Sequence, residues 1–269
     1  MNYKGFENVM NTLNLGADNG FITAVIGEPG SGKTTALNLF KKDHPEAILI
    51  TCSPTTSIYE LLLEIARGIG LQSIARNSFL VQKQIIEHLK SDSNHIIMFD
   101  ECEYLHSGNV TKLEVIRQIY DQVKIVPMIL SGTYKLKKLL VGNDKYDQPQ
   151  LYRRLLCASF NPLTKLELSN YLKILENRYN LVFNEEAIKD LYDLCLDSDN
   201  GGIGLTFKLL EIILSTIRPN WRIINYEQDY LVDKELIDCF EDHVDVKQMP
   251  LITIGHRTSL EAGKIKMHR

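Results

Sequence analysis

Three glycines, a lysine and a threonine stand at the spacing of a phosphate-binding loop. Residues 27–34 read Gly-Glu-Pro-Gly-Ser-Gly-Lys-Thr and follow the apolar run Phe21–Ile26. Glycine lets backbone N–H groups come close to phosphate oxygens. Lys33 can reach the β- and γ-phosphates, and the Thr34 hydroxyl can bind Mg²⁺. The loop predicts binding of a nucleoside triphosphate. The residues expected to contact it here are Gly27, Glu28, Pro29, Gly30, Ser31, Gly32, Lys33, Thr34 and Thr35.

A pair of carboxylates follows a second apolar run. The run His95–Asp100 ends in Asp100-Glu101 about 70 residues after the loop. A P-loop ATPase needs one strand-end carboxylate to hold Mg²⁺ and another residue to orient the attacking water. We expect Thr34 and Asp100 to hold the metal and Glu101 to orient the water. Glu103 is interpreted as a helix N-terminal or surface residue.

Two further segments have the character of catalytic elements in oligomeric ATPases. A strand over Lys124–Leu130 leads into Ser131-Gly-Thr133, and a polar side chain at such a strand end lies beside the γ-phosphate. Thr133 is the preferred residue and Ser131 the second choice. Arg153 and Arg154 precede the last expected strand, where such ATPases place an arginine that acts on the neighbouring subunit. Arg153 is preferred to Arg154.

Short apolar strands alternate with helical patterns through the first 160 residues, which predicts a parallel sheet covered on both faces. Besides those above, we expect strands at Ala47–Cys52 and near Cys157–Asn161. After Pro162 helical periodicity dominates. The predicted organisation is α/β: a nucleotide-binding domain with a five-stranded parallel sheet (1–162), an all-helical lid (163–230), and a C-terminal helix with a basic tail (231–269). The tail's cations are Arg257, Lys264, Lys266 and Arg269.

Composition sets limits on location and partners. The formal net charge is −4, which neither requires nor excludes nucleic acid, because a local basic groove can lie on an acidic protein. No apolar run is long enough to span a membrane, and the mixed polar N-terminus is unlike a signal peptide. The five cysteines form no C-x-x-C pair. We therefore expect a cytoplasmic protein without a membrane partner.

Taken together, the phrases GEPGSGKTTAL, DECEYL and LSGTYKL, followed by LYRR and NPLTKLE, resemble AAA+ ATPases. Within these they are similar to the transposition-regulator branch, the MuB-like and TnsC-like proteins, over about residues 5–230. The resemblance implies an ATPase that uses ATP and Mg²⁺, forms a homo-oligomer or helical filament on double-stranded DNA without sequence preference, and recruits or activates a transposase. ExeA-like or helicase-loader-like ATPases, which act on a protein partner, share the phrases and remain the alternative.

The resemblance also implies where DNA lies and where this chain departs from the family. The segment before Asp100 faces DNA in the family's filaments, so Arg76 and Lys83 are the DNA-binding candidates, through phosphate contacts. The family's lid helix begins with an arginine that touches the γ-phosphate. The segment from Gly201 to Lys208 has no arginine, and Lys208 is one turn further on. The expected consequence is either slow hydrolysis, stimulated by DNA or a partner, or a more open lid, and Lys208 is the candidate to replace the arginine.

Overall fold

The computed structural model describes residues 4–106, 112–141, 149–160, 164–196, 202–217 and 230–232. The chain divides into two compact units, residues 2–161 and the residues from 162 onward, and each has its own set of elements. The expected C-terminal helix and basic tail, with Arg257, Lys264, Lys266 and Arg269, lie outside the described residues. Within the described residues, no helix has the length and apolarity needed to cross a membrane.

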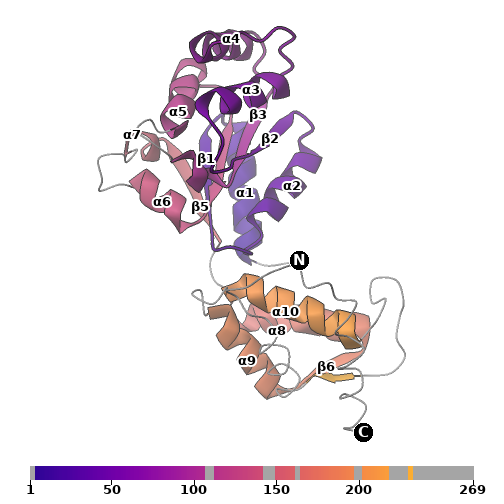
Figure 1. The fold of residues 1–269 in the computed structure, drawn as a ribbon. Coiled ribbons are helices and arrows are strands. Elements are labelled where there is room, and N and C mark those ends of the chain that lie inside the picture. Colours follow the sequence, from indigo (N-terminus) through magenta and orange to yellow (C-terminus); the bar gives the residue numbers. More distant parts are fainter. Residues whose placement is uncertain are drawn as a thin grey trace. The chain divides into compact units, whose positions relative to one another are not determined.

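The first unit is built on a five-stranded parallel sheet in the order β2-β3-β4-β1-β5 (Figure 1). Its strands are β1 (Ile22–Ile26), β2 (Ala47–Thr51), β3 (Ile96–Asp100), β4 (Met128–Gly132) and β5 (Leu155–Ser159). Because all strands are parallel, the ends of β1, β3 and β4 meet at one edge of the sheet. This confirms the predicted α/β fold and brings the phosphate loop beside Asp100.

Helices cover both faces of this sheet (Figure 1). Along β1, Ile22, Ala24 and Ile26 belong to a buried core shared with α3 to α6, whereas the intervening Thr23 and Val25 are buried outside that core. This alternation is the two-residue period of a strand covered on both sides. The helices of this unit are α1 (Lys4–Asp18), α2 (Lys33–Asp43), α3 (Ile58–Gly68), α4 (Ser78–Ser91), the 3₁₀ turn η1 (Cys102–Leu105), α5 (Lys112–Val123), α6 (Tyr134–Val141) and α7 (Pro149–Tyr152).

Strand β4 begins four residues later than the sequence pattern indicates. Lys124 has φ 55, and its N–H donates to the Tyr120 carbonyl, so this residue closes the end of α5 instead of opening a strand. Ile125 is exposed, and the buried strand starts only at Met128. The segment Lys124–Leu130 therefore contains a helix end and a turn as well as the start of a strand.

The described residues of the second unit form three helices and a short sheet. The helices are α8 (Lys165–Tyr179), α9 (Glu185–Leu196) and α10 (Gly202–Ile217). Helix α8 begins with a capping box in which Thr164 and Glu167 are bonded reciprocally. The Asn184 side chain accepts from the N–H of Ala187 at the start of α9. The expectation of a purely helical lid needs correction, because β6 (Leu181–Phe183) pairs in parallel with β7 (Tyr230–Val232). Three-residue strands are too short for their period to be recognised in a sequence.

Helix α1 packs closely against the sheet at Gly16. A Cβ added at Gly16 would lie 2.0 Å from the Thr23 Oγ1 on β1, and Thr23 is fully buried. Glycine inside a helix is normally destabilising relative to alanine by about 0.5–1 kcal/mol. Here the close approach to a stiff, β-branched side chain reverses that preference.

We expect Gly16→Ala to destabilise the protein by about 1–3 kcal/mol, because the added methyl group overpacks the contact with Thr23. Urea unfolding of the full chain measures this change. Leu15→Ala in the same helix is the control: Leu15 is 51% exposed, so its effect should stay within about 0.5 kcal/mol. The double variant Gly16→Ala/Thr23→Ala should be more stable than the sum of the two single effects predicts. A Gly16→Ala variant as stable as the parent would refute this account.

Candidate functional site: the phosphate loop and its carboxylates

The phosphate loop connects β1 to α2 in a conformation that depends on glycine. Gly30 and Gly32 have φ 76 and 96, values that glycine adopts without the cost of a Cβ. Gly32 is also the N-cap residue of α2, and no side chain caps this helix end. The first N–H groups of α2 therefore point toward the loop without a side-chain acceptor, which is the arrangement that binds an anion at a helix N-terminus.

Lys33 is held inside the loop that precedes it. Its side chain is buried, and Nζ donates to the carbonyls of Gly27 at 3.0 Å and Glu28 at 2.9 Å. Burial lowers the pKa of Lys33, while the nearby carboxylates of Glu103, Glu101, Asp100 and Glu28 act in the opposite direction. The lysine is thus a buried cation beside carboxylates, with donors that can turn from carbonyls to phosphate oxygens.

Asp100 is the centre of the site's hydrogen bonds. It is 2% exposed, and its Oδ2 accepts from the Thr34 hydroxyl at 2.7 Å. Its Oδ1 accepts from the Ser131 hydroxyl at 2.8 Å and from the backbone N–H of Glu101 at 3.0 Å. The residues expected to hold Mg²⁺, Thr34 and Asp100, are therefore in direct contact. Ser131, the second choice beside the γ-phosphate, is buried behind them and orients Asp100.

Glu101 directly follows β3 in the left-handed backbone region, with φ 57. A non-glycine residue in this region is uncommon and marks a functional or strained position. Burial raises the pKa of the Glu101 carboxyl, and the negative charges of Glu103 and Asp100 raise it further, against the opposing effect of Lys33. A carboxylate in this setting is suited to the role of a base that orients water.

Lys33, Thr34 and Glu101 border a cavity of about 720 Å³, a volume in the range of small-molecule sites. Thr133, the preferred residue at the end of β4, lies on its wall. The lining residues are Glu28, Pro29, Gly30, Gly32, Lys33, Thr34, Thr35, Glu101, Glu103, Tyr104, Thr133, Tyr134 and Lys135. Of the other predicted loop residues, Ser31 has a buried Oγ without a hydrogen-bond partner among the described residues. The donor set and this unsatisfied hydroxyl fit a triphosphate with Mg²⁺.

Glu103 is the functional candidate that the sequence interpretation missed. It is half-buried instead of lying on the surface, it lines the cavity, and its Oε2 accepts from the Thr133 N–H at 3.3 Å. Its place two residues after Glu101 was the available signal. However, that spacing places Glu103 beside Glu101 at the cavity only if the turn after β3 is known to be the 3₁₀ turn η1. Tyr104, Tyr134 and Lys135 carry no comparable sequence signal.

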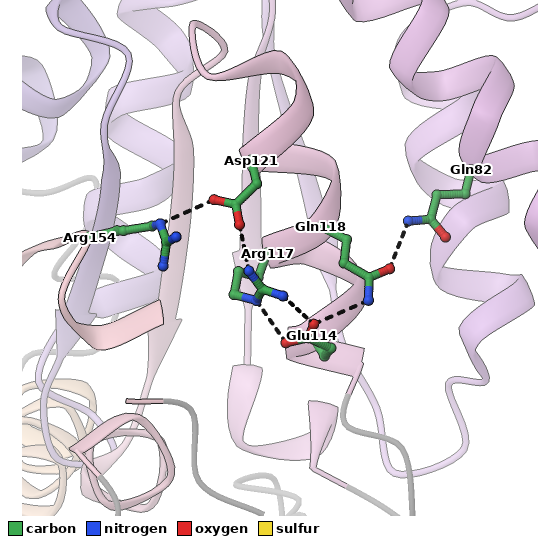
Figure 2. A network of polar contacts seen from close by, with 6 residues as sticks. All are labelled: Gln82, Glu114, Arg117, Gln118, Asp121 and Arg154. Atoms are coloured by element: carbon green, nitrogen blue, oxygen red, sulfur yellow. Dashed lines mark hydrogen bonds and ion pairs between the residues drawn. The ribbon is translucent and has the colours of Figure 1, made fainter. Parts of the chain in front are cut away.

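The two arginines differ in their surroundings. Arg154 forms an ion pair with Asp121 on α5 (Figure 2). On the same helix, Arg117 forms ion pairs with both Asp121 and Glu114. Gln118 bonds to Glu114 and to Gln82, and so connects this network to α4. Arg153 is exposed and has no hydrogen bond or ion pair with any described residue. Neither arginine lines the cavity of its own chain. This arrangement favours Arg153 over Arg154 as a residue available to a second subunit.

Arg76 and Lys83, the candidate DNA contacts, do not line this cavity. Arg76 is exposed, and the residue before it, Ala75, is fixed by two hydrogen bonds. The Ala75 N–H donates to the Gln84 side chain, and the Ala75 carbonyl accepts from the Tyr59 hydroxyl. Lys83 is exposed one helical turn after Phe79, with Nζ 5.1 Å from the ring centroid. Lys208 in α10 is exposed and forms an ion pair with Glu211 at 3.4 Å.

Comparison with known proteins agrees with this geometry. Residues 17–140 match the family model described as an AAA domain. The Mu-like prophage FluMu DNA transposition protein B of Haemophilus influenzae is 25% identical over 197 residues, covering 72% of this chain and 65% of that protein. The ATP-dependent target DNA activator B of Escherichia phage Mu is 24% identical over 125 residues, covering 46% of this chain and 38% of that protein.

Among solved structures, the ORC1 protein of Aeropyrum pernix, determined in complex with DNA, has a TM-score of 0.61 with 14% identity and covers 92% of this chain and 68% of that one. At this identity the match supports the fold alone. Fold, site and the family match over residues 17–140 together support an AAA+ P-loop ATPase. Within that class the chain is MuB-like, and it spans less than two thirds of the length of the curated relatives described above.

The mutual repulsion of Glu101 and Glu103 gives a pH prediction. If turnover needs ionised Glu101, activity falls as the pH drops through its raised pKa. Glu103→Gln removes one negative charge but keeps an acceptor for the Thr133 N–H. The acid limb of the kcat–pH profile should therefore move to lower pH. Glu28→Gln is the matched control, because Glu28 does not contribute to the pKa shift of Glu101. An acid limb that stays in place in Glu103→Gln would contradict this coupling.

Proposed function

We propose that this protein is an ATP-dependent, DNA-binding regulator of DNA transposition. It assembles on duplex DNA with ATP and recruits or activates a transposase. One observation carries the proposal: an AAA domain similar to transposition B proteins has its phosphate loop joined to the carboxylate of β3 by the Thr34–Asp100 hydrogen bond. That bond brings together a hydroxyl and a carboxylate, two ligand types that a triphosphate-bound Mg²⁺ takes, and so supports the proposal.

The proposed roles follow from the positions of the side chains. Lys33 would bind the β- and γ-phosphates once its donors leave the carbonyls of Gly27 and Glu28. Thr34 and Asp100 would hold Mg²⁺, which supplies positive charge to the transferring phosphoryl group. Glu101 would orient water, and Thr133 would contact the γ-phosphate from the opposite wall. Arg153 would act on the nucleotide of a neighbouring subunit.

The proposed DNA contacts are electrostatic. Arg76 stands beside the N-terminus of α4, and Lys83 lies on the first turns of the same helix. Exposed cations favour phosphate oxygens, and such contacts carry no sequence information. Binding should therefore be insensitive to sequence and should weaken steeply as salt is raised.

Glu101→Gln should abolish ATP turnover while leaving ATP binding intact, because it removes the proposed base but keeps the size and shape of the side chain. ATP-bound assemblies on DNA should then persist. A phosphate-release assay, a gel mobility shift with unrelated duplexes and negative-stain imaging measure the three quantities. Lys33→Ala is the control and should lose ATP-dependent assembly altogether.

The same experiment separates two classes of function. Salt-sensitive, sequence-independent DNA binding that requires ATP supports the transposition regulator. Turnover and assembly without DNA binding would refute it and would favour an ExeA-like or helicase-loader-like ATPase that acts on a protein partner.

Action of Arg153 between subunits can be tested by mixing two inactive variants. Arg153→Ala keeps Glu101, whereas Glu101→Gln keeps Arg153, so a mixed assembly contains sites with both groups. Each variant alone should lose activity, by up to about 10³-fold for the arginine, and the mixture should recover a fraction of it. Arg154→Ala is the matched control. It breaks the ion pair with Asp121 and should change stability more than turnover. No recovery in an equimolar mixture that assembles would contradict the proposed role.

A further inference from the structure

Three side chains with metal-ligating atoms converge at the junction between α4 and β3. His88 lies in the last turn of α4, Asp92 is the C-cap residue of that helix, and His95 directly precedes β3. One ligand atom from each of the three lies within 4.8 Å of those of the other two. The cluster is outside the nucleotide cavity and is absent from the set of residues that the sequence singled out.

The local backbone orients this cluster. The N–H of Asp92 donates to the His88 carbonyl at 2.8 Å, which fixes the end of the helix. The N–H of Asn94 donates to Asp92 Oδ1 at 3.0 Å. This leaves Asp92 Oδ2 facing the His95 Nε2, at 3.6 Å. A carboxylate whose second oxygen is held by a backbone N–H has the outer support that metal-ligating carboxylates usually have.

The two imidazoles have unused nitrogens. His88 Nε2 and His95 Nε2 are both buried and have no hydrogen-bond partner among the described residues. Their ring centroids are 5.7 Å apart, at an interplanar angle of 34°. Buried polar atoms of native proteins almost always have a hydrogen-bond partner. His88 Nε2 has none, and His95 Nε2 has only its 3.6 Å contact with Asp92 Oδ2, so both nitrogens need an explanation. A cation bound by all three groups supplies one.

We propose that His88, Asp92 and His95 bind a divalent transition-metal ion, and that Zn²⁺ is the ion that fits best. Two imidazole nitrogens and one carboxylate oxygen are a common zinc ligand set, and a water can complete four-coordinate geometry. Imidazole also disfavours Mg²⁺, which prefers oxygen ligands. The ligand atoms need to move closer together, because zinc–nitrogen and zinc–oxygen bonds are about 2.0–2.2 Å long.

The site would be structural, because it lies at the end of β3 opposite the nucleotide. At about 3.3 Å per residue, the Cα atoms of His95 and Asp100 are roughly 17 Å apart. A bound ion would join the C-terminal end of α4 to the start of β3. It would thereby hold in place the helix that carries Lys83, one of the two proposed DNA contacts.

The test uses the full chain, freed of metal with a chelator and then titrated with zinc chloride in the presence of excess Mg²⁺ and ATP. Calorimetry should give one Zn²⁺ per chain, and thermal unfolding should shift upward with Zn²⁺. With cobalt chloride, visible absorption bands should indicate nitrogen and oxygen ligands in a four-coordinate site. His88→Gln and His95→Gln should each weaken zinc binding by at least about tenfold.

Two further variants keep the test decisive. Asp92→Asn retains an acceptor for the Asn94 N–H and should leave metal-free stability unchanged while weakening zinc binding. His44→Gln is the matched control: His44 lies beside a carboxylate, with Nδ1 3.1 Å from Glu46 Oε1, but belongs to no three-residue cluster among the described residues. Zinc stoichiometry and affinity that are the same in wild type, His95→Gln and Asp92→Asn, or an absence of stoichiometric binding in wild type, would overturn the proposal.

Discussion

The buried carboxylate of Asp100 is the point on which the nucleotide site depends. Three donors surround it: the hydroxyls of Thr34 and Ser131 and the N–H of Glu101. These donors come from the first turn of α2, from β4 and from the turn after β3. An ionised group this deeply buried is costly unless it is hydrogen-bonded, so the three elements must keep their register for the carboxylate to be stabilised.

This requirement explains why the order of the strands matters. β3 and β4 are neighbours, and β4 also pairs with β1, which places the loop after β1 beside the ends of both. Ser131 can reach Asp100 only from the adjacent strand, and Thr34 only from the helix that follows the loop. The same packing buries Glu101, which raises the pKa of its carboxyl, and brings it near Lys33, whose positive charge lowers that pKa. The packing at the C-terminal ends of β1, β3 and β4 thus determines both the geometry and the charge of the nucleotide site.

Much of this could be predicted from the sequence, because the phosphate loop and the strand ending in Asp100-Glu101 are local patterns with known geometry. The strands β1, β3 and β4 are fully buried apolar runs, which a sequence reveals directly, whereas the edge strands β2 and β5 are only partly buried. The end of α5 was less predictable, since Lys124 closes the helix inside a run of apolar residues. Ser131 and Thr133 were both recognised, but only the structure distinguishes the residue that orients Asp100 from the one that lines the cavity. The contact between Glu103 and the Thr133 N–H and the Asp121–Arg154 pair depend on tertiary contacts that no local pattern indicates. His88, Asp92 and His95 are close in sequence, but they converge only because α4 ends at this point and β3 begins.

The charge of the cavity gives a physical reason to connect nucleotide binding with assembly. Its walls carry the carboxylates of Glu28, Glu101 and Glu103 against the cations of Lys33 and Lys135. A triphosphate adds further negative charge to a site that is already acidic, and a single divalent cation offsets only part of it. Neither Arg153 nor Arg154 lines the cavity, so an arginine that offsets this negative charge with its own positive charge would have to come from outside it. An exposed arginine from a second copy of the chain can supply that charge. Binding of the triphosphate would then favour the contact between subunits, and loss of the γ-phosphate would weaken it.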